Sequence, residues 1–321
     1  MYNHAFGLRQ NPFNLTPDPA FLFLTEQHRE ALAGLTYSLL QRKGFTVLTG
    51  DVGTGKTTLL SRILRFLPSS QLQFSLIVNP TLTPAEFLEL ALLDFGLTEV
   101  PESKAQRLWL LQNLILQGQR QGKVSALIVD EAHKLSPEVL EEIRLLGNFE
   151  EAEQKILQIL LVGQTELDQV LERPDLRQLK QRIGVRLSLG PLTPEQVDEY
   201  IRHRWVRAGG TVHPFTPVAV EGIGYLSKGI PRVINALCDT ALLGAFAKRS
   251  SVVGESHIRD AAKSFDLGEL PHREIPVETA APPAAEPHPV STISRLVTFS
   301  QRSSRWIKSA GRRLTPRHES M

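Results

Sequence analysis

The sequence is poor in the features that mark secreted and membrane-spanning proteins. Its 321 residues include a single cysteine, Cys238, so no internal disulfide can form. The N-terminus M-Y-N-H-A-F-G-L-R-Q has no apolar stretch of the kind found in signal peptides. No apolar run approaches the ~18 residues that a membrane-spanning helix needs. These absences lead us to expect a cytoplasmic protein.

Most of the chain also lacks a large net charge of either sign. The formal net charge is +2, but residues 290–321 hold seven basic residues against one acid, which leaves −4 for residues 1–289. A mildly acidic body argues against a broad nucleic-acid surface outside the C-terminal tail.

Five short apolar segments alternate with helical patterns in the first two thirds of the chain. The segments are residues 45–49, 74–78, 125–129, 156–162 and 185–189. Near-continuously apolar strands that alternate with helices predict an α/β fold, in which helices cover both faces of a mostly parallel sheet. Right-handed crossovers then place the C-terminal ends of all strands at one edge.

Capping signals predict where several helices begin. Thr83-Pro84-Ala85-Glu86 and Ser103-Lys104-Ala105-Gln106 both fit the capping box, and a further helical pattern starts at Thr25. Thr193-Pro194-Glu195-Gln196 opens another capped helix, after which nothing reads as a strong strand.

These patterns divide the chain into five parts. The prolines of the first 20 residues predict an extended arm, and the Pro/Ala-rich stretch near the C-terminus is too poor in large apolar groups to fold alone. The predicted parts are an arm at 1–20, an α/β core at 21–190, a small helical domain at 191–267, a linker at 268–289 and a basic tail at 290–321.

The most specific motif is G-D-V-G-T-G-K-T, which directly follows the first apolar segment and precedes a helical pattern. It fits G-x-x-x-x-G-K-[ST] in the strand-loop-helix context of a P-loop, whose backbone N–H groups surround phosphate oxygens. Lys56 is predicted to reach the β and γ phosphates, and the Thr57 hydroxyl to bind Mg²⁺. No N-K-x-D guanine signature occurs, so the predicted cofactors are ATP and Mg²⁺. The predicted nucleotide-binding residues are Gly50, Asp51, Val52, Gly53, Thr54, Gly55, Lys56, Thr57 and Thr58.

Two acids, Asp130 and Glu131, end the apolar segment that finishes at Val129. Because that segment should end at the same sheet edge as the P-loop, Asp130 is predicted to hold Mg²⁺ and Glu131 to activate the attacking water. The alternative is that both carboxylates only cap the helix after Ser136. His133 completes D-E-A-H, a helicase signature, but the chain has too little room for a second helicase domain, so we interpret His133 as a loop residue near the site.

Several stretches together resemble the AAA+ ATPases, and among them the ExeA-type secretion and pilus-assembly ATPases, relatives of the transposition ATPases and of Orc-type initiators. Besides the P-loop and the paired acids, the resemblance rests on F-G-L-x-x-x-P-F, T-P-D-P-x-F-L-F, H-R-E-A-L and R-K-G-F-x-V-L-T-G, all within residues 1–267. It implies a three-layer α/β/α P-loop NTPase core with a five-stranded parallel sheet, followed by a helical lid.

The resemblance also implies roles for residues outside the two motifs. Gln164 matches the sensor-1 position, although Thr165 stands where the family usually has proline, and Gln164 could instead cap the next helix. Arg232, in G-I-P-R-V-I-N-A-L, matches the sensor-2 arginine that points from the lid to the phosphates. Arg182 is the first choice and Arg177 the second for the arginine finger, unless both are solvated on a helix face.

A finger that acts in trans implies a homo-oligomer, closed as a ring or open as a spiral. The resemblance further implies that the arm, with Phe13, helps wall the adenine pocket. Two functions fit these features. One is an ATP-driven factor for assembly of a secretion, pilus or polysaccharide-export system, with an envelope protein as partner at the inner face of the cell membrane. The other is a DNA-associated regulator of the transposition or initiator type.

The tail lacks the membrane helix and peptidoglycan-binding domain with which ExeA-type proteins often continue. Apolar and basic side chains of residues 291–314 fall on largely different faces of a predicted helix. Such a segment could lie on an anionic membrane surface with Phe299 and Trp306 as anchors, bind nucleic-acid phosphate, or simply stay solvated. The apolar positions are Ile293, Leu296, Phe299, Trp306, Ala310 and Leu314, and the basic ones Arg295, Arg302, Arg305, Lys308 and Arg312.

Overall fold

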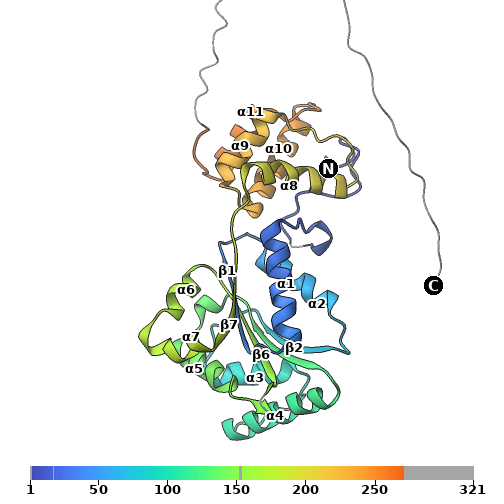
Figure 1. Cartoon of the computed structure of the whole chain (residues 1–321). Coiled ribbons are helices and arrows are strands. Elements are labelled where there is room, and N and C mark those ends of the chain that lie inside the picture. The colour runs from blue at the N-terminus through green and yellow to red at the C-terminus, as the bar shows by residue number, and fades with distance from the viewer. Residues whose placement is uncertain (1, 17, 152–153, 271–321) are drawn as a thin grey trace, which may run out of the picture. The chain divides into compact units, whose positions relative to one another are not determined.

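The computed structural model describes residues 2–16, 18–151 and 154–270. Figure 1 shows an α/β part with helices on both sides of a sheet and a second, purely helical part. The expectations for the linker beyond residue 270 and for the tail lie outside the described residues.

The sheet confirms the predicted α/β class. Its five strands are all parallel and lie in the order β2-β3-β6-β1-β7. All five strands are predicted from the sequence, with ends that differ by no more than two residues. The observed bounds are β1 (Phe45–Gly50), β2 (Leu72–Ile77), β3 (Val124–Val129), β6 (Leu157–Val162) and β7 (Ile183–Leu189).

Successive side chains of the buried strands pack alternately into two separate cores, one on each face of the sheet. On β3, Leu127 and Val129 pack into one core, while Ala126 and Ile128 pack into the other. Helices α1 (Glu26–Leu40) and α2 (Lys56–Phe66) cover the second face. The first face is covered by α3 (Pro84–Asp94), α4 (Lys104–Arg120), α5 (Pro137–Leu146), α6 (Glu166–Leu171) and α7 (Arg177–Arg182).

The predicted N-terminal caps are confirmed for three helices, and the prediction is wrong for one. The Thr83 and Thr193 boxes are both complete, and the Thr25 hydroxyl caps α1. Ser103 precedes α4 but makes no capping hydrogen bond, so that capping box is wrong. The sequence also gave no sign of the short antiparallel pair β4 (Glu150–Glu151) and β5 (Gln154–Lys155), or of the 3-10 turns η1 (Pro19–Phe21), η2 (Ala132–Lys134) and η3 (Pro174–Leu176).

Four helices after the sheet form the helical part around one core. Trp205, Ile234 and Cys238 are among its fully or almost fully buried side chains. The helices are α8 (Pro194–Arg207), α9 (Pro217–Ser227), α10 (Pro231–Ala247) and α11 (Glu255–Ser264).

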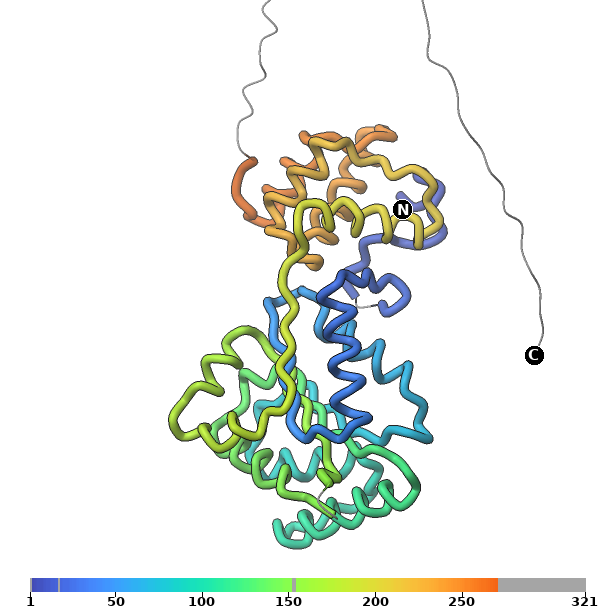
Figure 2. Tube along the Cα trace, viewed as in Figure 1, coloured from blue at the N-terminus to red at the C-terminus, as the bar shows by residue number. Residues whose placement is uncertain are grey.

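The N-terminal segment packs into the core of this helical part, which corrects the prediction of an extended arm. Residues 2–13 form successive turns, and Phe13 is completely buried with its ring edge-on to Phe215. The Arg9 N–H donates to the Ala208 carbonyl at 2.8 Å. Figure 2 shows the blue N-terminal trace beside the yellow α8. The arm turns instead of extending because its apolar side chains pack into a core formed by residues after 190.

Candidate nucleotide-binding site

The loop between β1 and α2 presents unsatisfied N–H groups, while most of its carbonyl groups accept hydrogen bonds. The Gly50 and Asp51 carbonyls accept hydrogen bonds from Lys56 Nζ at 2.7 and 2.9 Å. The N–H groups of Gly55, Lys56 and Thr57 meet no acceptor among residues 2–16, 18–151 and 154–270. With the partial positive charge at the start of α2, this arrangement suits an anion such as phosphate.

Lys56 is buried and lies near the two carboxylates that follow β3. Burial lowers the pKa of Lys56, whereas Glu131 and Asp130, in that order, act to raise it. A phosphate at the loop would add negative charge and favour the protonated amine further.

The two residues predicted to hold Mg²⁺ are in direct contact. Thr57 Oγ1 donates to Asp130 Oδ2 at 3.0 Å, and Asp130 is only 6% exposed. Mg²⁺ prefers oxygen ligands and takes one or two from protein, completing its shell with phosphate and water. A hydroxyl and a carboxylate at the edge of the phosphate loop therefore fit this ion.

Glu131 has a backbone conformation that is unfavourable for a residue other than glycine. Its φ of 55° is left-handed, which costs of order 1–3 kcal/mol for a non-glycine residue and occurs mostly at functional sites. Its Oε2 accepts a hydrogen bond from Gln164 Nε2 at 3.3 Å and lies 3.5 Å from His133 Nε2 and 3.6 Å from Lys134 Nζ. The side chain is thus held toward the end of β6, which lies between β1 and β3.

The alternative capping roles have no support in the structure. Ser136 caps α5 with its own hydroxyl, which accepts from Val139 N, so neither Asp130 nor Glu131 is needed there. Gln164 directs its side chain to Glu131, and its backbone N–H donates to His133 Nδ1 at 3.3 Å. His133 lies in the 3-10 turn η2 and not in an irregular loop as expected, and it supports the position of Gln164.

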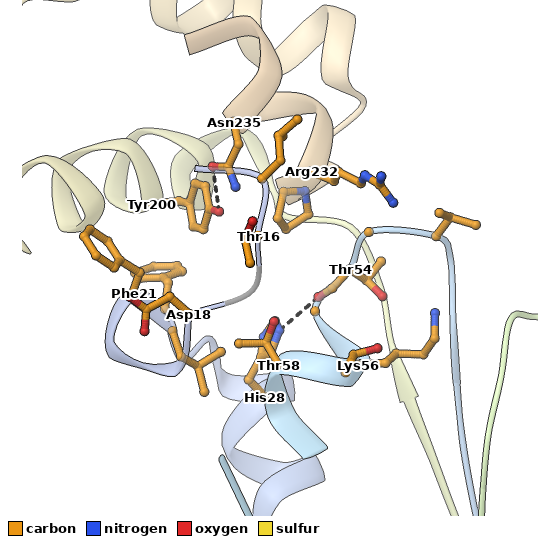
Figure 3. A pocket seen from close by; sticks show the side chains of 18 of the residues that line it. Thr16, Asp18, Phe21, His28, Thr54, Lys56, Thr58, Tyr200, Arg232 and Asn235 are labelled. Carbon is orange, nitrogen blue, oxygen red and sulfur yellow. Dashed lines mark hydrogen bonds between the residues drawn. The ribbon is translucent and has the colours of Figure 1, made fainter. Parts of the chain in front are cut away.

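Arg232 comes to the phosphate loop from the helical part. It lies in the first turn of α10 after Pro231, and its backbone N–H is 3.4 Å from the Gly53 carbonyl oxygen. Figure 3 shows Arg232 above Thr54 and Lys56. Its exposed guanidinium makes no hydrogen bond within the described part of the chain, which leaves it available to a ligand.

A cavity of about 310 Å³ extends from the phosphate loop toward the N-terminal segment and α8. At that end Tyr200 Oη donates to Asn235 Oδ1 at 2.9 Å, and the buried Arg204 donates to Tyr200 Oη at 3.0 Å and to the Pro12 carbonyl at 2.6 Å. The Arg204 guanidinium also lies 4.9 Å from the Phe21 ring centre. This network was not predicted from the sequence, although T-P-D-P-x-F-L-F and the sensor-2 stretch contain residues on both of its sides.

Phe13 does not line this cavity, so its expected contact with the base is corrected. The ring of Phe13 is buried in the core of the helical part. The next three residues, Asn14, Leu15 and Thr16, line the cavity instead.

The two candidate finger arginines lie away from the cavity of their own chain, as a group acting in trans would. Neither lines it. Arg182 is half-buried and its Nη1 donates to the Arg144 carbonyl at 3.0 Å. Arg177 is exposed, and its guanidinium has no hydrogen-bond or ion-pair partner among the described residues.

Comparison with known proteins places this site in a family. Residues 39–171, which run from the end of α1 through the phosphate loop, the paired acids and Gln164, match a family model described as an AAA domain. The chain is an AAA+ protein. It is 45% identical over 267 residues to general secretion pathway protein A of Aeromonas hydrophila, an alignment that covers 82% of this chain. This AAA+ protein spans 48% of the length of that relative.

Solved structures confirm the AAA+ fold. The ORC2 protein of Aeropyrum pernix superposes with a TM-score of 0.58 at 18% identity, covering 79% of this chain and 71% of that one. Cdc6p of Pyrobaculum aerophilum gives 0.57 at 16% identity, covering 77% and 70%. None of the helices within the described residues has the length and apolar character needed to cross a bilayer.

Proposed function

We propose that this AAA+ protein binds ATP with Mg²⁺ in the cavity and hydrolyses it to ADP and phosphate. The observation that carries the proposal is the meeting of two groups of residues at one edge of the sheet. Open N–H groups and Lys56 of the phosphate loop face the contacting pair Thr57 and Asp130, while Gln164 holds Glu131 beside them.

In the proposed reaction each of these residues has a separate task. Lys56 leaves a loop carbonyl and binds a phosphate oxygen, while Thr57 and Asp130 hold Mg²⁺. Bound Mg²⁺ would neutralise charge that develops on the β and γ phosphates. Glu131 accepts a proton from the attacking water, which Gln164 helps to orient. Arg232, which belongs to the lid, binds the γ-phosphate. The position of α10 therefore depends on whether the γ-phosphate is present.

We further propose that the active form is a homo-oligomer in which an arginine of one subunit completes the site of the next. An arginine finger can contribute about 10³ to 10⁵ in rate. Neither Arg177 nor Arg182 lines the cavity of its own chain, which supports action in trans. A contact of this head-to-tail kind closes into a ring or continues as a spiral.

The cellular role we propose is coupling of ATP hydrolysis to assembly or remodelling of a secretion, pilus or polysaccharide-export system. The likeness to general secretion pathway protein A supports a role related to secretion. The expected site of action is the cytoplasmic face of the cell membrane, with an envelope protein as partner. The second candidate, a DNA-associated regulator, is less favoured because residues 1–289 carry a net charge of −4.

Two variants test the proposed chemistry. Lys56→Ala should abolish ATP binding, because it removes the only side-chain cation of the loop that reaches the phosphates. Glu131→Gln should retain ATP and lose turnover, because the amide cannot accept the proton. ATP binding and cleavage by the Lys56 variant at the level of the parent would refute the proposed function. Unchanged turnover in the Glu131 variant would mean that nucleotide is a structural ligand only.

The cellular role needs a separate experiment. ATPase rates are measured with duplex DNA and with anionic liposomes, for the full chain and for a chain that ends before residue 290. We expect liposomes to stimulate the full chain only, and DNA to have little effect on the shortened one. Strong DNA stimulation of the shortened chain would favour the DNA-associated regulator.

A further inference from the structure

His28 links the first helix to the phosphate loop. It lies in the first turn of α1, is 4% exposed, and places its Nε2 at 3.2 Å from the Thr54 carbonyl oxygen (Figure 3). No other donor among the described residues binds this carbonyl, not even the N–H of Thr58 one helical turn later. His28 is thus the single partner of a carbonyl group in the middle of the phosphate loop.

The contacts of His28 determine where its proton lies. A carbonyl oxygen only accepts hydrogen bonds, so Nε2 must carry the hydrogen that points to Thr54. The other nitrogen, Nδ1, lies 2.7 Å from the Thr25 hydroxyl. That hydroxyl accepts from the His28 backbone N–H at 3.2 Å and has its own hydrogen free for Nδ1. Thr25 therefore orients the ring, and burial supports the neutral form by lowering the pKa of His28.

The Thr54 carbonyl and the Gly55 N–H belong to the same peptide unit. In a trans peptide these two groups point in opposite directions, because the unit is planar. A hydrogen bond that draws the carbonyl toward His28 therefore turns the Gly55 N–H away from α1. This N–H is one of those at the start of α2 that have no acceptor within the described residues.

Glycine at position 55 leaves this orientation open. Gly55 has a φ of 103°, and glycine adopts positive and negative φ with similar ease, so the peptide unit could rotate without a steric penalty at that residue. The chain needs an external contact to select the orientation that serves an anion.

We infer that His28 is a positioning residue of the phosphate loop, which holds the Thr54–Gly55 peptide unit with its N–H directed to the bound phosphate. The inference rests on the proposed binding of nucleotide. His28 touches no reacting group, so its contribution belongs to ligand affinity and not to the chemical step.

Three substitutions separate hydrogen bonding from packing. His28→Gln keeps an N–H donor that can reach the Thr54 carbonyl, His28→Phe keeps a ring of similar size without a donor, and His28→Ala removes both. Arg29→Ala is the control, because Arg29 is exposed and its side chain donates only to the Leu24 carbonyl. Affinity for Mg·ADP, melting temperature and the KM and kcat of ATP hydrolysis are measured for each.

We expect His28→Phe and His28→Ala to weaken Mg·ADP binding and to raise KM by about tenfold, the effect of one buried hydrogen bond, with kcat within about twofold of the parent. His28→Gln should recover most of the affinity, and Arg29→Ala should match the parent. A role in packing alone would give the reverse order, in which His28→Phe binds like the parent and His28→Gln does not, and that order would overturn the inference.

A measurement on the parent protein keeps the inference testable if a variant fails to fold. Nitrogen NMR of the imidazole ring should show a neutral His28 with its hydrogen on Nε2, both without and with ADP. A hydrogen on Nδ1 alone would overturn the inference, because Nε2 could not then donate to Thr54. Failure of the parent to bind ADP would refute the proposed function, and this inference with it.

Discussion

At the scale of single residues, the two candidate finger arginines differ in what they already bind. Arg182 is tied to the last turn of α5 through the Arg144 carbonyl, and it would lose that bond on reaching a neighbouring subunit. Arg177 begins α7 and is exposed, and its side chain makes no polar contact with the rest of the described chain. The family resemblance made Arg182 the first choice, whereas this difference favours Arg177.

Substituting each arginine by alanine should separate a structural role from a catalytic one. Arg182→Ala should lower the free energy of unfolding by about 1–3 kcal/mol, because a charged hydrogen bond to a carbonyl is lost. Arg177→Ala should leave unfolding unchanged and reduce ATP turnover by about 10³ or more. Denaturant unfolding and steady-state ATPase assays measure the two effects.

Mixed oligomers provide the control for action in trans. Subunits with Arg177→Ala retain Glu131, and subunits with Glu131→Gln retain Arg177, so a mixture contains some interfaces with both groups. We expect the mixture to regain activity that neither variant has alone. If the mixture stays inactive while Arg182→Ala combined with Glu131→Gln recovers, the finger is Arg182.

At the scale of elements, the passage from β7 to α8 is held by a close backbone contact. The Leu192 N–H donates to the Gly229 carbonyl at 2.8 Å, just before the turn that leads into α10 and Arg232. Gly229 has a φ of 74°, and a Cβ atom built there would lie 2.1 Å from the Leu192 carbonyl oxygen. This contact fixes the start of the lid next to the helix that carries Arg232.

Gly229→Ala should therefore destabilise the protein by about 2 kcal/mol or more, since it adds both a backbone clash and an unfavourable φ. The same substitution should displace Arg232, so the affinity for Mg·ATP should fall. Gly244→Ala is the matched control, because Gly244 lies within α10 with nothing within 4 Å of its added Cβ, and alanine favours a helix by about 1 kcal/mol. Equal unfolding midpoints for the two variants would contradict this account of the contact.

At the scale of the whole molecule, three partly or fully buried histidines make stability depend on pH. His28, His203 and His213 each have a pKa lowered from 6.5, and burial is the largest cause for all three. A lowered pKa means that, below pH 6.5, the unfolded chain takes up protons that the folded chain does not. The free energy of unfolding should accordingly fall as the pH drops below 6.5, toward the lower pKa values of the folded state.

Urea unfolding at pH 7.5 and at pH 5.5 tests this expectation. The midpoint should be lower at pH 5.5, and His28→Gln should reduce the difference because it removes one of the three groups. A midpoint that is equal or higher at pH 5.5 would show that other groups control the acid response.

Sequence by itself determined the parts of this protein whose signals are local. Apolar runs of strand length identified all five strands of the sheet, and the P-loop and the paired acids identified Lys56, Thr57, Asp130 and Glu131. Topology rules then brought these residues to one edge, because parallel strands joined by right-handed crossovers end on the same side. The contact between Thr57 and Asp130 follows from that reasoning, although 73 residues separate them.

Tertiary structure alone decided the contacts that depend on a distant partner. Phe13 is buried against a core formed after residue 190, Arg182 is held by a carbonyl of α5, and His28 binds the middle of the phosphate loop. Periodicity and capping describe each segment by itself, whereas these contacts depend on which surface happens to lie opposite it in the folded chain. At Gly55 the local sequence even permits two backbone orientations, and only the packing of α1 against the loop selects one.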